Sequence, residues 1–160
     1  KKIKELKLEK IKIWDGLSLK IPKRWMRDID FDVKKAKFNI SGIKNSYFFI
    51  DFEKVEYPLN YEIKESDIME IARNIVNDTN TKNLKIKKSA ENEYLLRISG
   101  NEEIDSKRNT IRQYFWHRFI YRNNLLKVAN FVLLIQKNNE YIELELINMF
   151  NLLIGNADFY

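Results

Sequence analysis

The chain has 160 residues, of which 44% are hydrophobic and 13% aromatic, enough to bury the core of one ordinary domain. It contains no cysteine and a single histidine, which excludes disulfide bonds and thiolate chemistry and argues against a structural zinc site. The apolar runs are far shorter than the ~20 residues that a membrane-crossing helix needs, so no membrane span is expected in this chain.

Much of the positive charge lies at the start of the chain. Residues 1–12 hold six lysines and two glutamates, which supply +4 of the formal net charge of +6. Residues 1–9 fit neither a helix nor a strand cleanly, so we expect a basic arm or frayed segment there, followed by one domain over residues 10–160. The first residue is lysine rather than methionine, which is compatible with the removal of an N-terminal leader sequence. The sequence does not decide the subcellular compartment, and the cell envelope is slightly favoured over the cytoplasm.

The first predicted element is a hairpin or sharply turned strand. Apolar residues alternate on both sides of Asp15-Gly16, a dipeptide that favours tight turns. Pro22 cannot donate a backbone hydrogen bond, so the second arm should end there. Trp25 follows closely and is expected to fold back over the edge of the sheet.

The middle of the chain predicts further strands and one helix. We expect two strands between Phe31 and Val55, broken near Gly42 or Asn45. An amphipathic helix should open at Ser66-Asp67 and close after Asp78, because its apolar residues recur with helical spacing. Two shorter strands are expected over residues 84–88 and 93–99.

The last third predicts a long hairpin and a helix. Residues 110–122 are rich in aromatic and β-branched side chains, Asn123-Asn124 suits a turn with positive φ, and residues 125–136 are apolar on both faces. A helix over about residues 139–154 should begin at Asn138 or Asn139 and end at Gly155 in a left-handed cap. The order predicts an α+β fold, with a middle and a C-terminal helix packed on a mainly antiparallel sheet as an α/β/α sandwich.

The opening hairpin carries a family resemblance. Residues 16–22, which read GLSLKIP, followed by Trp25, resemble the Gly-x-Ser-x-x-x-Pro-x-x-Trp opening of the PsbP-like and DcrB-like superfamily, which also includes a eukaryotic Ran-binding nuclear transport factor. The order of elements from residue 10 to residue 160 is also similar, although the Lys-rich start and the scarcity of glycine depart from common members. The resemblance implies a domain that binds proteins and has no shared catalytic set. Alternatively, Gly16, Pro22 and Trp25 are purely structural.

The strongest candidate for a functional surface lies in the predicted strand over residues 111–122. Alternation along a strand would place Arg112, Tyr114, Trp116, Arg118 and Arg122 on one face. Arginines interleaved with aromatic rings can hold phosphates while nucleotide bases stack on the rings. The favoured alternative is a solvent-facing side of the sheet on which the arginines lie over the rings.

Catalytic candidates are weaker. His117 would share a face with Phe115, and no serine or threonine nucleophile motif accompanies it. Asp51 and Glu53 would point to the same side of a strand and Glu56 follows, so these carboxylates could hold a cation or act as acid and base. A half-buried histidine and a solvated charged edge explain both features more simply.

The sequence therefore predicts a non-catalytic domain, of bacterial type, that binds another protein through a sheet edge or through the arginine and aromatic face. Binding of nucleic acid or another polyanion through that face is the alternative. A hydrolase that uses Asp51 or Glu53 is a weaker third hypothesis. No cofactor and no metal are expected.

Overall fold

The computed structural model describes residues 7–13, 16–79, 84–90, 93–98, 102–104, 108, 110–137 and 140–159. The first six residues lie outside this part of the chain, as do Trp14 and Asp15 of the opening hairpin, Gly100, and the expected helix caps Asn138 and Asn139.

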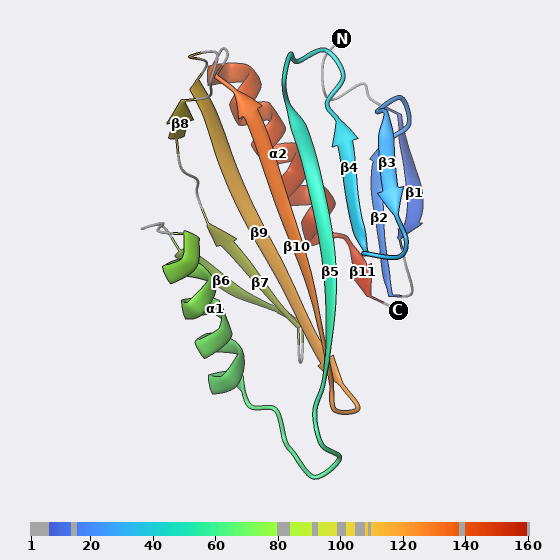
Figure 1. The fold of residues 1–160 in the computed structure, drawn as a ribbon, viewed down its shortest axis with the longest axis vertical. Helices are drawn as coiled ribbons and strands as arrows, with labels where there is room; N and C mark the ends of the chain where they lie inside the picture. The colour runs from blue at the N-terminus through green and yellow to red at the C-terminus, as the bar shows by residue number, and fades with distance from the viewer. Residues whose placement is uncertain are drawn as a thin grey trace.

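Antiparallel strand is the commonest structure among the described residues, which also form one helix in the middle and one near the C-terminus (Figure 1). The elements are β1 (Leu8–Ile13), β2 (Leu17–Pro22), β3 (Arg27–Asp30), β4 (Lys35–Asn39), β5 (Tyr47–Glu56), α1 (Glu65–Thr79), β6 (Leu84–Ala90), β7 (Glu93–Ile98), β8 (Glu102–Ile104), β9 (Thr110–Arg122), β10 (Leu125–Gln136), α2 (Glu140–Gly155) and β11 (Asp158–Phe159). This confirms the predicted α+β class.

The strands form two sheets rather than one. The larger sheet has eight strands in the order β3-β4-β5-β10-β9-β7-β6, with β8 also paired to β9, and the smaller has three in the order β1-β2-β11. The longest ladder joins β9 to β10 from Leu125↔Arg122 to Gln136↔Ile111, and the intervening Asn123 and Asn124 have φ of 52° and 62°. The predicted positive-φ turn of this hairpin is thus confirmed.

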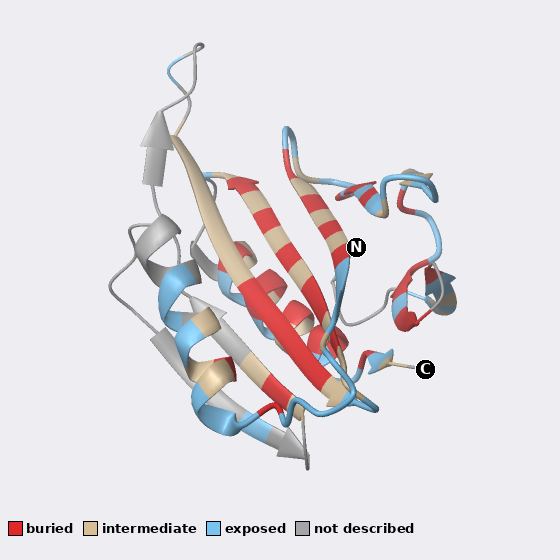
Figure 2. Cartoon of the chain, turned by 60° about the horizontal axis from the view of Figure 1, so that its bottom comes forward, coloured by how far each residue is buried: buried red, intermediate tan, exposed pale blue. Residues whose placement is uncertain are grey.

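The two helices cover opposite faces of the larger sheet. Successive side chains of a strand point to opposite faces, and on β9 Trp116 packs in one buried cluster with α2 while Phe119 packs in another with Ile68 of α1. The three-stranded sheet shares the α2 side, because Leu19 and Ile21 of β2 join the same cluster as Trp116. Along β10 buried and half-buried residues alternate (Figure 2), so one face of this strand is more deeply covered than the other.

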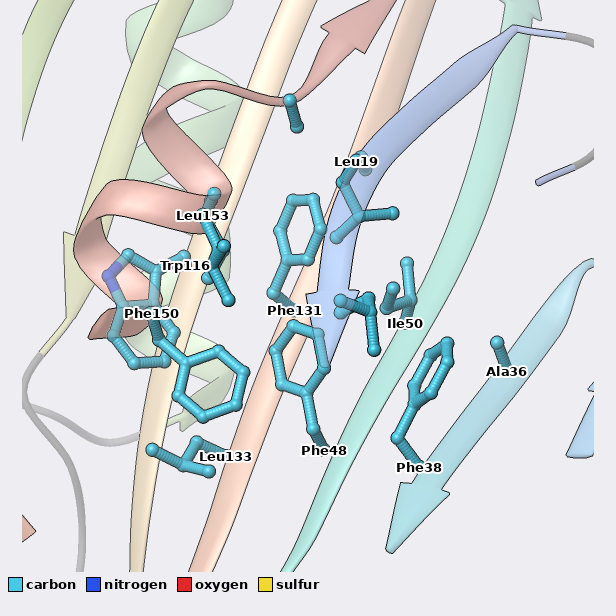
Figure 3. Close-up of a cluster of buried hydrophobic side chains, with 14 of the residues drawn as sticks. Leu19, Ala36, Phe38, Phe48, Ile50, Trp116, Phe131, Leu133, Phe150 and Leu153 are labelled. Carbon is cyan, nitrogen blue, oxygen red and sulfur yellow. The ribbon is translucent and has the colours of Figure 1, made fainter. Parts of the chain in front are cut away.

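The main core is built around aromatic rings from three elements. The ring of Phe48 on β5 stacks on Phe131 of β10 at 6.0 Å between centroids and lies 4.3 Å from the ring of Phe150 on α2. All three side chains are fully buried, and Figure 3 shows them between the strands of the large sheet and α2. These contacts fix α2 on the sheet, because aromatic pairs add to the stabilisation from burial alone.

Several expectations for the fold need correction. β1 begins at Leu8, inside the segment expected as a basic arm. The short strands β3, β8 and β11 were not expected from the sequence; β11 has only two residues and is defined by its pairing with β2. α2 ends at Gly155 without the left-handed cap, since only Gly16 and Gly42 have positive φ among the described glycines. Instead, the amide of Asn156 donates to the carbonyl of Leu152 at 3.0 Å.

Replacing Phe48 with alanine should destabilise the fold by about 3–5 kcal/mol, because the cavity lies between two sheet strands and α2 and cannot easily collapse. Urea denaturation followed by fluorescence measures this difference. Phe31→Ala is the matched control. Phe31 is 63% exposed, so this variant should lose little free energy of unfolding. Equal losses in the two variants would show that Phe48 is not at the centre of the core.

Candidate functional site

The arginine and aromatic face predicted on β9 exists, but it faces the interior. Residues 110–122 form one strand, so Arg112, Tyr114, Trp116, Arg118 and Arg122 point to the same side of the sheet, as expected. That side is the one covered by α2. The expectation that it faces solvent is wrong for Trp116, which is fully buried and donates from Nε1 to Oδ1 of Asn151 on α2 at 2.9 Å.

Arg118 is the most deeply buried cation of this face, with 4% of its surface exposed. Its Nη1 donates to the backbone carbonyls of Ile154, at 3.3 Å, and Ala157. Its Nη2 lies 3.5 Å from Oε2 of Glu93 on β7, and its guanidinium sits 5.1 Å from the centroid of the Phe159 ring. Arg118 therefore holds the segment from the end of α2 to β11 against the large sheet.

The electrostatics around Arg118 explain why a buried cation is tolerated there. Burial lowers the pKa of the Arg118 guanidinium, and the negative charges of Glu93 and Asp158 act in the opposite direction. The group remains protonated, because an arginine is not deprotonated in a protein. A buried charge needs such partners, and the carboxylate and carbonyls supply them.

The other arginines of the face are also paired. Nη1 of Arg112 lies 2.7 Å from Oε2 of Glu143, whose side chain is only 3% exposed on α2. Nη2 of Arg122 lies 3.3 Å from Oε1 of Glu93, and the Arg122 side chain is 62% exposed. Of the five predicted residues, Arg122 is exposed, Arg112 and Tyr114 are half-buried, and Trp116 and Arg118 are buried. A continuous exterior surface of rings and arginines does not form here.

The three signature residues of the opening hairpin have structural contacts. Gly16 has φ of 145°, which side-chain-bearing residues rarely adopt. Pro22 ends β2, and its carbonyl accepts a hydrogen bond from the amide of Trp25 at 3.2 Å. The Trp25 ring is buried 5.6 Å from the ring of Phe150, so Trp25 covers the core as the structural interpretation predicted.

The two catalytic candidates of the sequence are joined through a residue that sequence reasoning missed. Asn130 of β10 lies directly opposite both His117 and Asp51. Nδ2 of Asn130 donates to Oδ1 of Asp51 at 2.5 Å, so its Oδ1 is the acceptor facing Nδ1 of His117 at 2.6 Å. Asp51 thereby fixes the orientation of the amide, and the amide fixes the proton of His117 on Nδ1. The link through Asn130 could be found only from the strand register, which pairs these three positions.

The hydrogen bonds among Asp51, Asn130 and His117 fit a structural role in the sheet better than a catalytic role. His117 is 6% exposed, and its Nε2 is buried with no hydrogen-bond partner among the described residues. Burial lowers the pKa of His117, and the Asn130 hydrogen bond and the charge of Asp51 only partly offset that effect. No described hydroxyl group is hydrogen-bonded to His117, as activation of a nucleophile would require.

The three acidic candidates on β5 differ in exposure. Glu53 and Glu56 are exposed on β5, whereas Asp51 is half-buried and bonded to Asn130. Within the described ranges, no three residues of the acidic, histidine or cysteine type come close enough to hold a metal ion.

A groove lies between the small sheet and the end of α2. Its volume is about 540 Å³, within the range of ligand sites. The lining residues come from β1, β2 and the end of α2 with the segment that follows it: Leu8, Lys10, Ser18, Leu19, Lys20, Leu152, Leu153, Asn156 and Asp158. Sequence reasoning missed this site, because it forms only where the small sheet meets α2.

The groove combines apolar and positively charged groups. Leu8 is 40% exposed and Leu152 is 67% exposed, although both are large hydrophobic residues. Nζ of Lys10 lies 3.6 Å from Oδ2 of Asp158, and Lys20 adds a further positive charge directly opposite Lys10 on β2. The one feature of the sequence that could have indicated the groove is Leu152, an apolar residue that lies outside the buried face of its helix.

Neither a protein-family model, a curated protein nor a solved structure matches this chain. Of the described helices, none is both long and apolar enough to cross a membrane. The function of this chain is therefore inferred from the chemistry of its own sites.

Replacing Arg118 with alanine should destabilise the fold by about 3 kcal/mol, since Glu93 and the carbonyls of Ile154 and Ala157 would lose a buried cation. Urea denaturation measures the change in the free energy of unfolding. Arg24→Ala is the control, because Arg24 is exposed. A loss below ~1 kcal/mol for Arg118→Ala would contradict the assigned role.

Stability should fall on acidification between pH 7.5 and 5.5. The pKa of His117 is lowered in the folded state from its ordinary 6.5, so the unfolded chain takes up a proton that the folded chain does not. Stability is then full above the unfolded-state pKa and declines as pH drops toward the folded-state pKa, by at most about 1.4 kcal/mol per pH unit for one proton.

Urea denaturation at a series of pH values tests this dependence. His117→Gln, which lacks the titrating ring, should remove most of the slope in this window, since the chain has no other histidine. An unchanged slope in the variant would assign the pH dependence to other groups.

Proposed function

We propose that this protein is a non-catalytic protein-binding domain, and that its partner places an extended segment with acidic and apolar side chains in the groove between the small sheet and α2. The observation that carries the proposal is the exposure of Leu8 and Leu152 beside Lys10 and Lys20. Large exposed apolar side chains rimmed by charge are typical of interaction sites.

The charge of the groove determines which partner fits. Two lysines face the one carboxylate of Asp158, and the whole chain carries a formal charge of +6. An acidic segment is therefore attracted both by the groove and by the protein as a whole. The apolar side chains of the same segment would bury Leu8 and Leu152, which supplies most of the affinity.

The resemblance of the opening motif to PsbP-like and DcrB-like proteins supports the same class of function, because members of that superfamily mostly bind other proteins. The sequence predicted a binding surface on β9, but Trp116 and Arg118 are buried there. We therefore assign the binding surface to the groove.

Selection from a library of displayed random peptides on the full chain tests the proposal. Enriched peptides should combine acidic with large apolar residues. The double variant Lys20→Glu, Leu152→Asp should bind them at least about tenfold more weakly, equivalent to about 1.4 kcal/mol. Both side chains are exposed, so the fold should tolerate the change.

The matched control is Lys44→Glu with Leu59→Asp, which makes the same changes at exposed positions that do not line the groove. Its affinity for the enriched peptides should equal that of the original chain. Failure to enrich any motif, or an equal loss of affinity in both double variants, would overturn the proposal.

A further inference from the structure

The face of the large sheet that carries α1 is covered only in part. On β10, Val128 on this face is buried, whereas Val132 and Leu134 are half-buried. On β9, Phe119 is buried and Phe115 is half-buried. α1 packs on the buried part of the face, and in Figures 1 and 2 no described element lies over the other part.

The uncovered part of this face is apolar. Register places Val132 of β10 between Phe49 of β5 and Phe115 of β9, and it places Leu134 directly opposite Tyr47. We call these five half-buried residues the open face. When one face of an antiparallel sheet meets water, its side chains are usually polar. An apolar face at the surface is instead typical of an interaction site.

One cation lies on the open face and limits what can bind there. Nζ of Lys37 on β4 lies 4.3 Å from the centroid of the Tyr47 ring and 5.9 Å from that of Phe49. The ammonium thus occupies the ring face on which a nucleotide base would stack. No ion pair between described residues includes Lys37, although Asp28 lies directly opposite it on β3. The open face therefore suits apolar protein side chains with a carboxylate for Lys37.

α2 has a second apolar surface, on the side that points away from the sheet. Leu144 and Leu152 are 57% and 67% exposed, and the exposed Asn148 lies between them at helical spacing. We call these three residues the outer stripe. Glu145 borders the stripe and belongs to no ion pair between described residues. A helix that is apolar on both sides is typical of one that is covered on both sides.

We propose that copies of this chain associate head to tail, with the outer stripe of one copy on the open face of the next. A helix is a common cover for the face of a sheet, and α1 already covers the rest of this face. The dimensions agree, since the stripe from Leu144 to Leu152 is about 12 Å long and residues 132–136 of β10 span about 14 Å. Glu145 supplies the carboxylate that Lys37 lacks.

The two surfaces differ, so each bound copy keeps one of them free. Such an interface generates a ring or an open chain of copies rather than a closed two-fold dimer. Leu152 is the one residue of the outer stripe that also lines the groove, so the variants below leave it unchanged. A chain that binds peptides in the groove but stays monomeric would overturn the association alone.

Sedimentation velocity of the full chain, from micromolar to millimolar concentration, tests the proposal. The mean mass should rise with concentration. Leu144→Asp removes an apolar group of the stripe, and Lys37→Glu places a carboxylate against Glu145. Each should weaken association at least about tenfold, equivalent to about 1.4 kcal/mol. Both positions are exposed, so the fold should tolerate the changes.

A one-to-one mixture of the two variants, at a concentration where each alone is monomeric, separates this arrangement from others. The intact stripe of the Lys37→Glu chain can bind the intact open face of the Leu144→Asp chain, so the mixture should form dimers that grow no further. Leu59→Asp and Lys23→Glu are controls at exposed positions outside both surfaces, and should associate as the original chain does.

Three results would each overturn the proposal. The first is the mass of a single chain at every concentration, and the second is a mixture that stays monomeric. The third is association that persists undiminished in the Leu144→Asp chain, which would indicate contact between copies through another surface.

Discussion

The fold depends on one buried cation. The last carbonyls of a helix have no partner within the helix and carry a partial negative charge. The final turn of α2 contains no basic residue to compensate for this. Arg118 supplies the missing positive charge from β9, through hydrogen bonds to the carbonyls of Ile154 and Ala157. The large sheet thereby caps the helix that covers it.

The proposed binding groove depends on the short segment that Arg118 holds. Asn156 and Asp158 line the groove, whereas the ring of Phe159 lies against the Arg118 guanidinium. Asp158 and Phe159 are successive residues of β11, so their side chains point to opposite sides. Pairing of Asp158 with Ser18 and of Phe159 with Leu17 then fixes the segment to the small sheet. One buried arginine thus positions residues that line the groove.

The polar chain of Asp51, Asn130 and His117 shows how a catalytic-looking set can have a structural role. Its hydrogen bonds run across β5, β10 and β9 at one level of the sheet. Buried polar groups that are well satisfied favour a single arrangement of the strands, since a slip in register would leave them unpaired. The exception is Nε2 of His117, which has no described partner and makes this level of the sheet sensitive to pH.

The sequence by itself determined the α+β class, the long hairpin with its Asn123-Asn124 turn, both helices and the alternation along β9, because these features follow from local spacing and turn chemistry. It could not determine what covers each face. Packing alone decided that α2 lies over Trp116 and Arg118, which turned a predicted exterior surface into core.

The groove and the link through Asn130 likewise required tertiary structure. Each brings together residues from separate elements, such as Lys20 with Leu152 or Asp51 with His117. Periodicity places a side chain on a face of its own strand or helix, but only strand register and the docking of α2 place it beside a partner from elsewhere in the chain.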